Sequence, residues 1–181
     1  IHPENNGSGL EASARDERYQ VIKENLTQNE LLLTAHHKDD QLETILFRIF
    51  RGTGINGLRG IVHYKDDKSH IILRPLLNYS RADLEGYAAA NRIKWIDDDS
   101  NEDTSFDRNY IRNLLVPKIK ERWSRAEESA HRLSIIAAEN YELLNELALE
   151  DLSEESDHES VGIDRFDSHS IPRIKNMIRF L

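Results

Sequence analysis

Residues 31–58 read LLLTAHHKDDQLETILFRIFRGTGINGL, and this stretch carries the pattern from which the fold is predicted. It opens with an apolar run over 31–35, which is typical of a parallel strand buried on both faces. Apolar residues then recur at helical spacing over 38–51, and Gly52 suits the position just past a helix end. The predicted buried face of this helix contains Leu42, Ile45 and Ile49. The stretch therefore predicts a strand, a polar turn, a helix and a glycine-rich loop.

Side chains that can act in catalysis or ligand binding are concentrated in the polar turn. His36 and His37 follow the apolar run directly, and Asp40 and Glu43 lie three residues apart, on one face of the helix start. In open α/β sheets, ligands bind outside the carboxyl ends of the strands. We therefore expect a functional site at this turn, whereas Asp39 is interpreted as a carboxylate that favours the positive helix N-terminus.

The glycine-rich loop contains the pattern G-x-G-x-x-G at Gly52, Gly54 and Gly57. A dinucleotide-binding fingerprint requires this pattern after a strand and before a helix. Here it follows a helix, so a Rossmann fold is not expected. The glycines are interpreted as positions where backbone approaches a ligand or turns tightly.

Composition limits the class of protein. The chain has 181 residues, of which 38% are hydrophobic, enough for one domain or for one domain and part of another. No window reaches the roughly 20 apolar residues of a membrane helix, so no membrane association is expected. The absence of cysteine excludes disulfides and thiolate-bound metal and fits the cytoplasm.

The charge is unevenly distributed along the chain. A net charge of −9 argues weakly against general affinity for nucleic acid. Residues 108–125, however, contain six basic side chains and one acidic one, whereas 142–159 contain eight acidic side chains and no lysine or arginine. A basic segment that could contact RNA phosphates therefore precedes an acidic one.

Further elements are expected around the central stretch. A helix is predicted from about residue 9 to residue 26, a polar hairpin-like insert over 64–70 and a strand over 71–73. Ser80 begins a capping-box pattern at the start of another helix. A last strand is expected over 93–96.

The second part of the sequence is predicted to be mainly helical. A long helical pattern covers 123–152, and the polar, acidic segment 153–160 is a candidate boundary. A short strand and a helix with Pro172 in its first turn are expected after it. We therefore predict a partial nucleotide-binding and catalytic α/β domain over 1–122. A linker helix and the start of a second, mainly helical domain are expected over 123–181.

Three stretches of the sequence resemble motifs of one enzyme family. HHKDDQLETILFRIFRGTGINGL, over 36–58, resembles HHxDDQxET…RGxGxxGL, and RPLL over 74–77 matches directly. DDDSNEDTSFDRNYIRNLLVP, over 97–117, resembles DxSNxDxxxxRNxIRxxxxP. These are motifs of the tRNA(Ile)-lysidine synthetases, which are PP-loop ATP pyrophosphatases. The resemblance covers roughly 9–181 and implies an α/β fold, with part of a parallel sheet flanked by helices.

The resemblance also implies an activity. ATP, accompanied by Mg²⁺, would adenylate the C2 position of the wobble cytidine of tRNA(Ile) with a CAU anticodon. The ε-amine of free lysine would then displace AMP. The number of subunits is left open, with a homodimer as one option.

The predicted site residues fall into three groups. Asp40 and Glu43 are expected to hold the lysine ammonium, His36 to orient the activated intermediate, and Arg112 to steady developing charge. Residues expected to bind substrate or nucleotide are His37, Arg51, Gly52, Gly54, Gly57, Arg108 and Asn109. Residues expected to bind tRNA are Arg74, Lys118, Lys120 and Arg122. No metal ligands are assigned.

Two alternative functions remain open from the sequence. One is a metal-dependent phosphohydrolase with His36, His37, Asp40 and Glu43 as ligands. The other is a non-catalytic RNA-binding fragment. The second follows from the absence, within these 181 residues, of the SGGxDS loop with which the resembled enzymes grip pyrophosphate. On this ground the chain is expected to be an interior fragment that is inactive alone.

Overall fold

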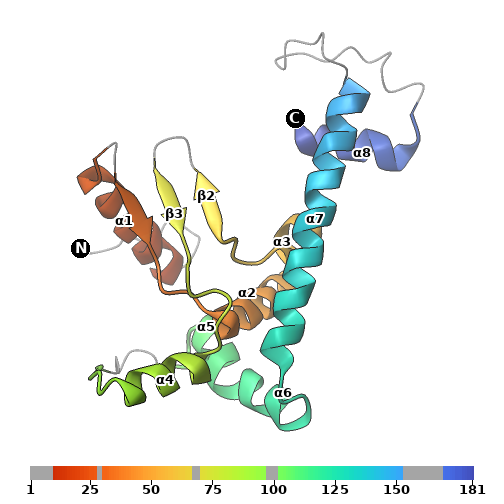
Figure 1. Cartoon of the computed structure of the whole chain (residues 1–181). Helices are drawn as coiled ribbons and strands as arrows, with labels where there is room; N and C mark the ends of the chain where they lie inside the picture. The colour runs from red at the N-terminus through yellow and green to blue at the C-terminus, as the bar shows by residue number, and fades with distance from the viewer. Residues whose placement is uncertain (1–9, 28–29, 67–69, 97–101, 153–168) are drawn as a thin grey trace.

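The computed structural model describes residues 10–27, 30–66, 70–96, 102–152 and 169–181, with the side chains of 10–16 left out (Figure 1). The strands are β1 (Leu31–Leu33), β2 (Tyr64–Asp66) and β3 (Ile71–Leu73). The helices of the first half are α1 (Leu10–Asn25), α2 (Lys38–Phe50), α3 (Ile55–Leu58) and α4 (Arg81–Ala90). Those of the second half are α5 (Asp107–Tyr110), the π-helical η2 (Ile111–Leu115), α6 (Val116–Arg122), α7 (Ala126–Leu152) and α8 (Ile171–Phe180).

The three described strands form one mixed sheet in the order β1-β3-β2. β1 runs parallel to β3, with Leu32 opposite Ile72, which confirms the predicted strands and their parallel pairing. β2 runs antiparallel to β3, with Lys65 opposite Ile72. The polar insert therefore supplies an antiparallel strand. With helices around it, this small sheet confirms the predicted α/β class.

The expectation that the strand over 31–35 is buried on both faces is wrong. Leu31 and Leu33 are 45% and 61% exposed. Side chains two residues apart in a strand point to the same face of the sheet. That face of β1 is open in the described part of the chain, and β1 has only β3 beside it there.

The strand predicted over 93–96 is also wrong. Arg92 has a φ of 55°, the left-handed conformation that commonly follows a helix end. The N–H of Ile93 then donates to the carbonyl of Ala88, which terminates α4 and occupies a donor that a strand ladder would need. Ile93 and Ile96 are 49% and 96% exposed.

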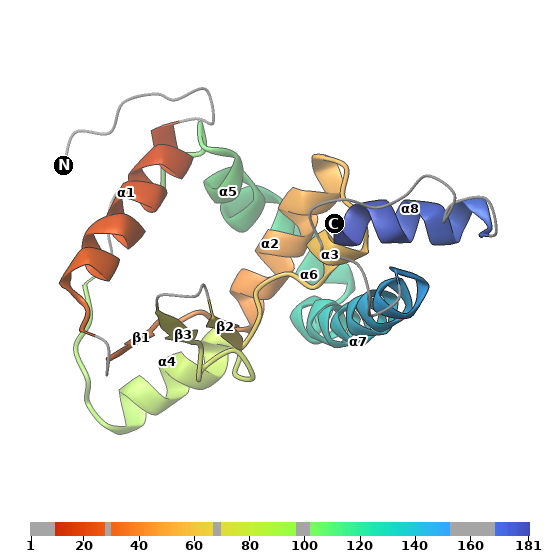
Figure 2. The ribbon, with the colours of Figure 1, turned by 90° about the horizontal axis from the view of Figure 1, so that it is seen from above.

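The core forms where α2 meets the second half of the chain. Figure 2 shows α2 between α1 on one side of the molecule and α7 on the other. The buried residues of this core are Leu42, Ile45, Ile111, Val116, Ala126 and Ala130. The predicted helix is confirmed from Lys38 to its cap at Arg51. Ile49, predicted to be buried, is 47% exposed because it lies in the last turn, beyond the part of α2 that the core covers.

The long helix α7 begins three residues later than predicted. Trp123 instead caps the end of α6, and its N–H donates to the carbonyl of Ile119. α7 packs against α2 and α3 and, farther along, against α8, whose first turn contains Pro172 as predicted (Figure 1). The start of α7 shares a core with α2, so the domain division at residue 122 stays a prediction.

Two sequence-based expectations fall outside the described residues: the boundary over 153–160 and the short strand after it. Among the helices that the structure describes, none combines the length and apolar character needed to cross a membrane.

Candidate active site

The first turn of α2 is fixed by its own side chains. His37 is the N-cap residue, and its N–H donates to Asp40 Oδ2 over 3.0 Å. The N–H of Asp40 in turn donates to His37 Nδ1, which makes a reciprocal capping box. His36 lies just before this turn, with Nδ1 2.8 Å from the hydroxyl of Thr34. His37 therefore caps the N-terminus of α2, and an acidic residue three positions later, Asp40, was the sequence signal for this capping box.

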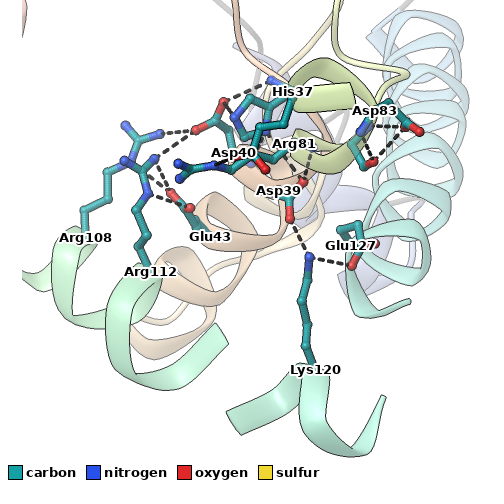
Figure 3. Close-up of polar contacts among 12 residues, drawn as sticks. His37, Asp39, Asp40, Glu43, Arg81, Asp83, Arg108, Arg112, Lys120 and Glu127 are labelled. Carbon is teal, nitrogen blue, oxygen red and sulfur yellow. Dashed lines mark hydrogen bonds and ion pairs between the residues drawn. The ribbon is translucent and has the colours of Figure 1, made fainter. Parts of the chain in front are cut away.

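Asp40 and Glu43 are buried carboxylates that face one arginine (Figure 3). Arg112 donates from Nε to Glu43 Oε1 and from Nη2 to Glu43 Oε2, both over 2.8 Å. The same Nη2 reaches Asp40 Oδ1 over 3.1 Å. The hydrogen bond to Glu43 raises the pKa of Arg112 further above its ordinary value. Two carboxylates on one face of α2 therefore converge on a permanent cation.

Arg108 contacts the same carboxylates more loosely. Its Nη2 lies 3.4 Å from Asp40 Oδ1 and its Nε lies 3.6 Å from Glu43 Oε2. Arg108 and Arg112, four positions apart in the sequence, therefore lie together beside Asp40 and Glu43. Asn109 donates its amide to the carbonyl of Asp103. Arg112 lies in the π-helical segment, a helix form that is common at functional sites.

Asp39 has contacts with two other elements, α4 and α6, that sequence reasoning missed. Its Oδ2 accepts from the backbone N–H of Arg81 at the start of α4 over 2.7 Å, and its Oδ1 accepts from Lys120 Nζ over 2.5 Å. Lys120 also lies 3.0 Å from Glu127 Oε2 on α7 (Figure 3). The only sequence signal was a third acid beside Asp40, which helix-end electrostatics already explained.

The pKa values of this cluster follow from its geometry. Burial acts to raise the pKa of Asp39, but the N–H of Arg81 and the ammonium of Lys120 outweigh it and hold that pKa below its ordinary value. Burial acts to lower the pKa of Lys120, but Asp39 and Glu127 raise it above its ordinary value. Both groups are therefore charged at neutral pH.

The glycine-rich loop is attached to α2 by two polar side chains. Gln41, only 1% exposed, accepts from the N–H of Ile61 over 2.6 Å and donates to the carbonyl of the same residue. Arg48 Nη1 donates to the carbonyls of Gly57 and Gly60. The available sequence signal was that both residues are polar and lie seven positions apart on an amphipathic helix.

The predicted loop residues lie at the turn between α2 and α3, except Gly57, which lies within α3. Gly52 has a φ of +74°, as the predicted residue just past the helix end, and Gly54 is the N-cap residue of α3. A Cβ added at Gly57 would meet Thr53 Oγ1 at 1.6 Å. Arg51 is exposed and its guanidinium lies 5.1 Å from the ring of Phe47.

The residues predicted to bind tRNA differ in exposure. Arg74 is buried and donates to the carbonyl of Val62 over 2.7 Å, so its guanidinium presents little surface to a phosphate. Lys120 is bound within the Asp39 cluster. Lys118 and Arg122 are exposed on α6. Their roles toward RNA stay predictions.

The residues proposed as ligands of a metal-dependent phosphohydrolase have other partners. Asp40 and Glu43 accept from arginines, and the rings of His36 and His37 contact Thr34 and Asp40. Over the described ranges, no group of three or more His, Cys, Asp or Glu residues is arranged to hold a metal ion.

Comparison with known proteins adds a family and a set of relatives. The model of a PP-loop domain family matches residues 1–119. The chain is 45% identical over 146 residues to the tRNA(Ile)-lysidine synthase of Photorhabdus laumondii. This match covers 81% of the chain and 33% of the length of that synthase. The chain is 39% identical over 173 residues to the synthase of the same name from Actinobacillus pleuropneumoniae, covering 94% of this chain and 41% of that protein.

A third similar protein is the tRNA(Ile)-lysidine synthase of Pseudomonas aeruginosa, with 42% identity over 146 residues. The matches cover 33% to 41% of the length of these relatives. The resemblance found from the motifs is therefore confirmed.

Proposed function

We propose that this chain, which belongs to the PP-loop domain family, supplies the lysine-handling and ATP-using site of a tRNA(Ile)-lysidine synthase. The name shared by these relatives supports the reaction, and the buried pair of carboxylates supports the assignment of the lysine-binding residues. In the reaction, the C2 oxygen of the wobble cytidine attacks the α-phosphorus of ATP and releases pyrophosphate. The lysine ε-amine then attacks C2, the C2–O bond breaks, and AMP leaves.

The observation that carries the proposal is the pair of buried carboxylates, Asp40 and Glu43. Both lie at the exit of a parallel strand, where open α/β folds bind ligands. A buried carboxylate pair is suited to an ammonium group, because charge-assisted hydrogen bonds are about twice as strong as neutral ones. A carboxylate can also accept the proton that the amine must lose on attack.

The arginines supply the complementary charge. Arg112 and Arg108 lie beside the carboxylates, and we assign their two guanidiniums to the phosphate charge of the adenylation step. ATP is a substrate here, and Mg²⁺ would be held mainly through its phosphates. Lys118 and Arg122, exposed on α6, are the proposed contacts to the tRNA backbone.

Asp40→Asn and Glu43→Gln test the assignment. Each would be introduced into a chimaera in which this chain replaces the matching segment of the Photorhabdus laumondii synthase. Loss of a charge-assisted bond to the ammonium costs about 1.5–3 kcal/mol, or a factor of about ten or more in lysine use. Pyrophosphate release and lysine incorporation would be measured separately, and lysine incorporation should fall much further.

Glu121→Gln is the matched control, since Glu121 is exposed on α6 and its change removes the same charge. It should leave both steps unchanged. Equal loss of both steps in Asp40→Asn and Glu43→Gln would move these carboxylates to the ATP site. No loss in either step would contradict the proposed function.

A further inference from the structure

The carboxylate pair is electrically balanced by the chain's own cations. Each of its four oxygens has an N–H partner within the protein. Asp40 Oδ2 accepts from the N–H of His37, and Asp40 Oδ1 from Arg112. Both Glu43 oxygens accept from the guanidinium of Arg112. Arg108 adds a second positive charge at 3.4 Å and 3.6 Å. Two acids therefore face two cations.

A balanced cluster of this kind does not attract a third cation strongly. A lysine ammonium that approached Asp40 and Glu43 would meet two guanidiniums within a few ångströms, and their repulsion would offset its attraction to the acids. The ammonium gains the full attraction only when one guanidinium moves away. Lysine binding at this pair therefore requires a displacement within the protein.

The geometry distinguishes the two arginines. Arg112 makes a bidentate bond to Glu43 with both distances at 2.8 Å, which is the strongest arrangement for such a pair. The corresponding contacts of Arg108 are 3.4 Å and 3.6 Å, and its nearer contact shares Asp40 Oδ1 with Arg112. Removing Arg108 from the cluster leaves every carboxylate oxygen with its partner, whereas removing Arg112 does not.

We propose that Arg108 is a displaceable latch that occupies the place of the lysine ammonium beside Asp40 and leaves when lysine binds. This inference rests on the proposed function of the site. The displaced guanidinium is then free to pair with an anion, and a phosphate group is the anion that the reaction brings. Because coupling between two ligands is reciprocal, a phosphate that draws Arg108 away strengthens lysine binding. The latch thereby favours lysine entry after the phosphate-bearing substrate is in place.

The test is a titration of L-lysine into the 181-residue chain by calorimetry at low ionic strength. Arg108→Ala should bind lysine about five- to tenfold more tightly than the unchanged chain, the range expected for loss of one partly exposed competing cation. Arg132→Ala is the control, because it removes the same charge from an exposed position on α7. It should leave the lysine affinity unchanged. Arg108→Gln keeps the first part of the side chain, removes the charge and serves if the alanine variant does not fold.

A second arm tests the coupling. Inorganic phosphate, at an ionic strength matched with chloride, should tighten lysine binding to the unchanged chain and have no effect on Arg108→Ala. Equal or weaker lysine binding by Arg108→Ala would overturn the latch while leaving the proposed lysine site intact. Absence of lysine binding to the unchanged chain and to both Arg108 variants would overturn the proposed lysine site, and the latch with it.

Discussion

Replacing Lys120 by methionine is the sharpest test of how the first turn of α2 is held. Lys120 joins Asp39 on α2 to Glu127 on α7, at 2.5 Å and 3.0 Å. Methionine keeps most of the aliphatic stem and removes the ammonium. The two carboxylates would then face each other without their shared cation, although Asp39 would keep its bond from the N–H of Arg81.

The magnitude follows from the burial of the three groups. The side chains of Asp39 and Glu127 are 13% and 11% exposed, whereas that of Lys120 is 30% exposed. Breaking a fully buried pair costs about 3–5 kcal/mol, and an exposed one about 0–1 kcal/mol. An intermediate loss of about 2 kcal/mol is expected, which for a chain of this size lowers Tm by about 4–8 °C.

The loss should depend on pH in a defined direction. The folded-state pKa of Asp39 lies below its ordinary value, so the unfolded chain binds more protons as the pH falls. The stability that Asp39 contributes is therefore present at neutral pH and lost as the pH falls through its folded pKa. Without Lys120 that pKa moves up, so the difference between the two proteins should shrink below about pH 4.

Thermal unfolding followed by circular dichroism across a pH series provides the measurement. Lys118→Met is the matched control, because Lys118 is exposed on the same helix two residues earlier. Its Tm should stay within about 1–2 °C of the unchanged chain. Equal Tm losses in the two variants, or a loss in Lys120→Met that does not change between neutral and acid pH, would refute the argued role of the Asp39 cluster.

Two further predictions concern the packing around α2 and the end of α7. Gly60→Ala should lower the free energy of unfolding in urea by about 1–3 kcal/mol, because Gly60 has a φ of +61° and the new Cβ would lie 2.4 Å from Gln41 Oε1. The control Gly54→Ala, whose Cβ would meet nothing within 4 Å, should change it by no more than about 0.5 kcal/mol, and similar losses in the two variants would contradict this reasoning. Asp151→Asn removes the carboxylate that accepts from Arg173 Nε over 2.8 Å, so amide hydrogen exchange should accelerate in α8, over 171–180, and stay unchanged in α2. Unchanged exchange in α8 would show that this ion pair does not hold α8 against α7.

Local signals made much of the fold predictable. The start of α2 at Lys38 followed from where the apolar period changes, and its end from Arg51 and Gly52. Pro172 likewise marked the first turn of α8. Each of these features depends on residues within one or two turns, where backbone sterics and helix-end hydrogen bonds decide the structure.

Burial was less predictable, because it depends on what covers a segment. The run over 31–35 is apolar enough for a strand buried on both faces, yet two of its leucines are exposed in the described chain. Ile49 continues the periodicity of α2 but lies past the end of the core. The apolar residues over 93–96 suggested a strand, but the N–H of Ile93 donates to the carbonyl of Ala88 and ends α4 instead.

Long-range pairing could not be deduced from the residues. The motifs placed Asp40, Glu43 and Arg112 in one expected site, but nothing in the sequence predicts a bidentate bond between Glu43 and Arg112, which lie 69 positions apart. The Asp39–Lys120 pair, 81 positions apart, had no sequence signal. Such pairs form because buried charges need partners, and the fold decides which partners are within reach.

Helix geometry then explains why adjacent acids on α2 have different roles. Successive residues of an α-helix point about 100° apart, so Asp39 and Asp40 face different helices, although both lie near the ring of His37. Asp39 points to α4 and α6, where a backbone N–H and a lysine bind it firmly. Asp40 points to α5 and η2, where one of its two arginines is held loosely. The firmly bound acid fixes the turn, and Asp40, whose contact with Arg108 is the looser one, is therefore the acid that we propose receives a substrate ammonium.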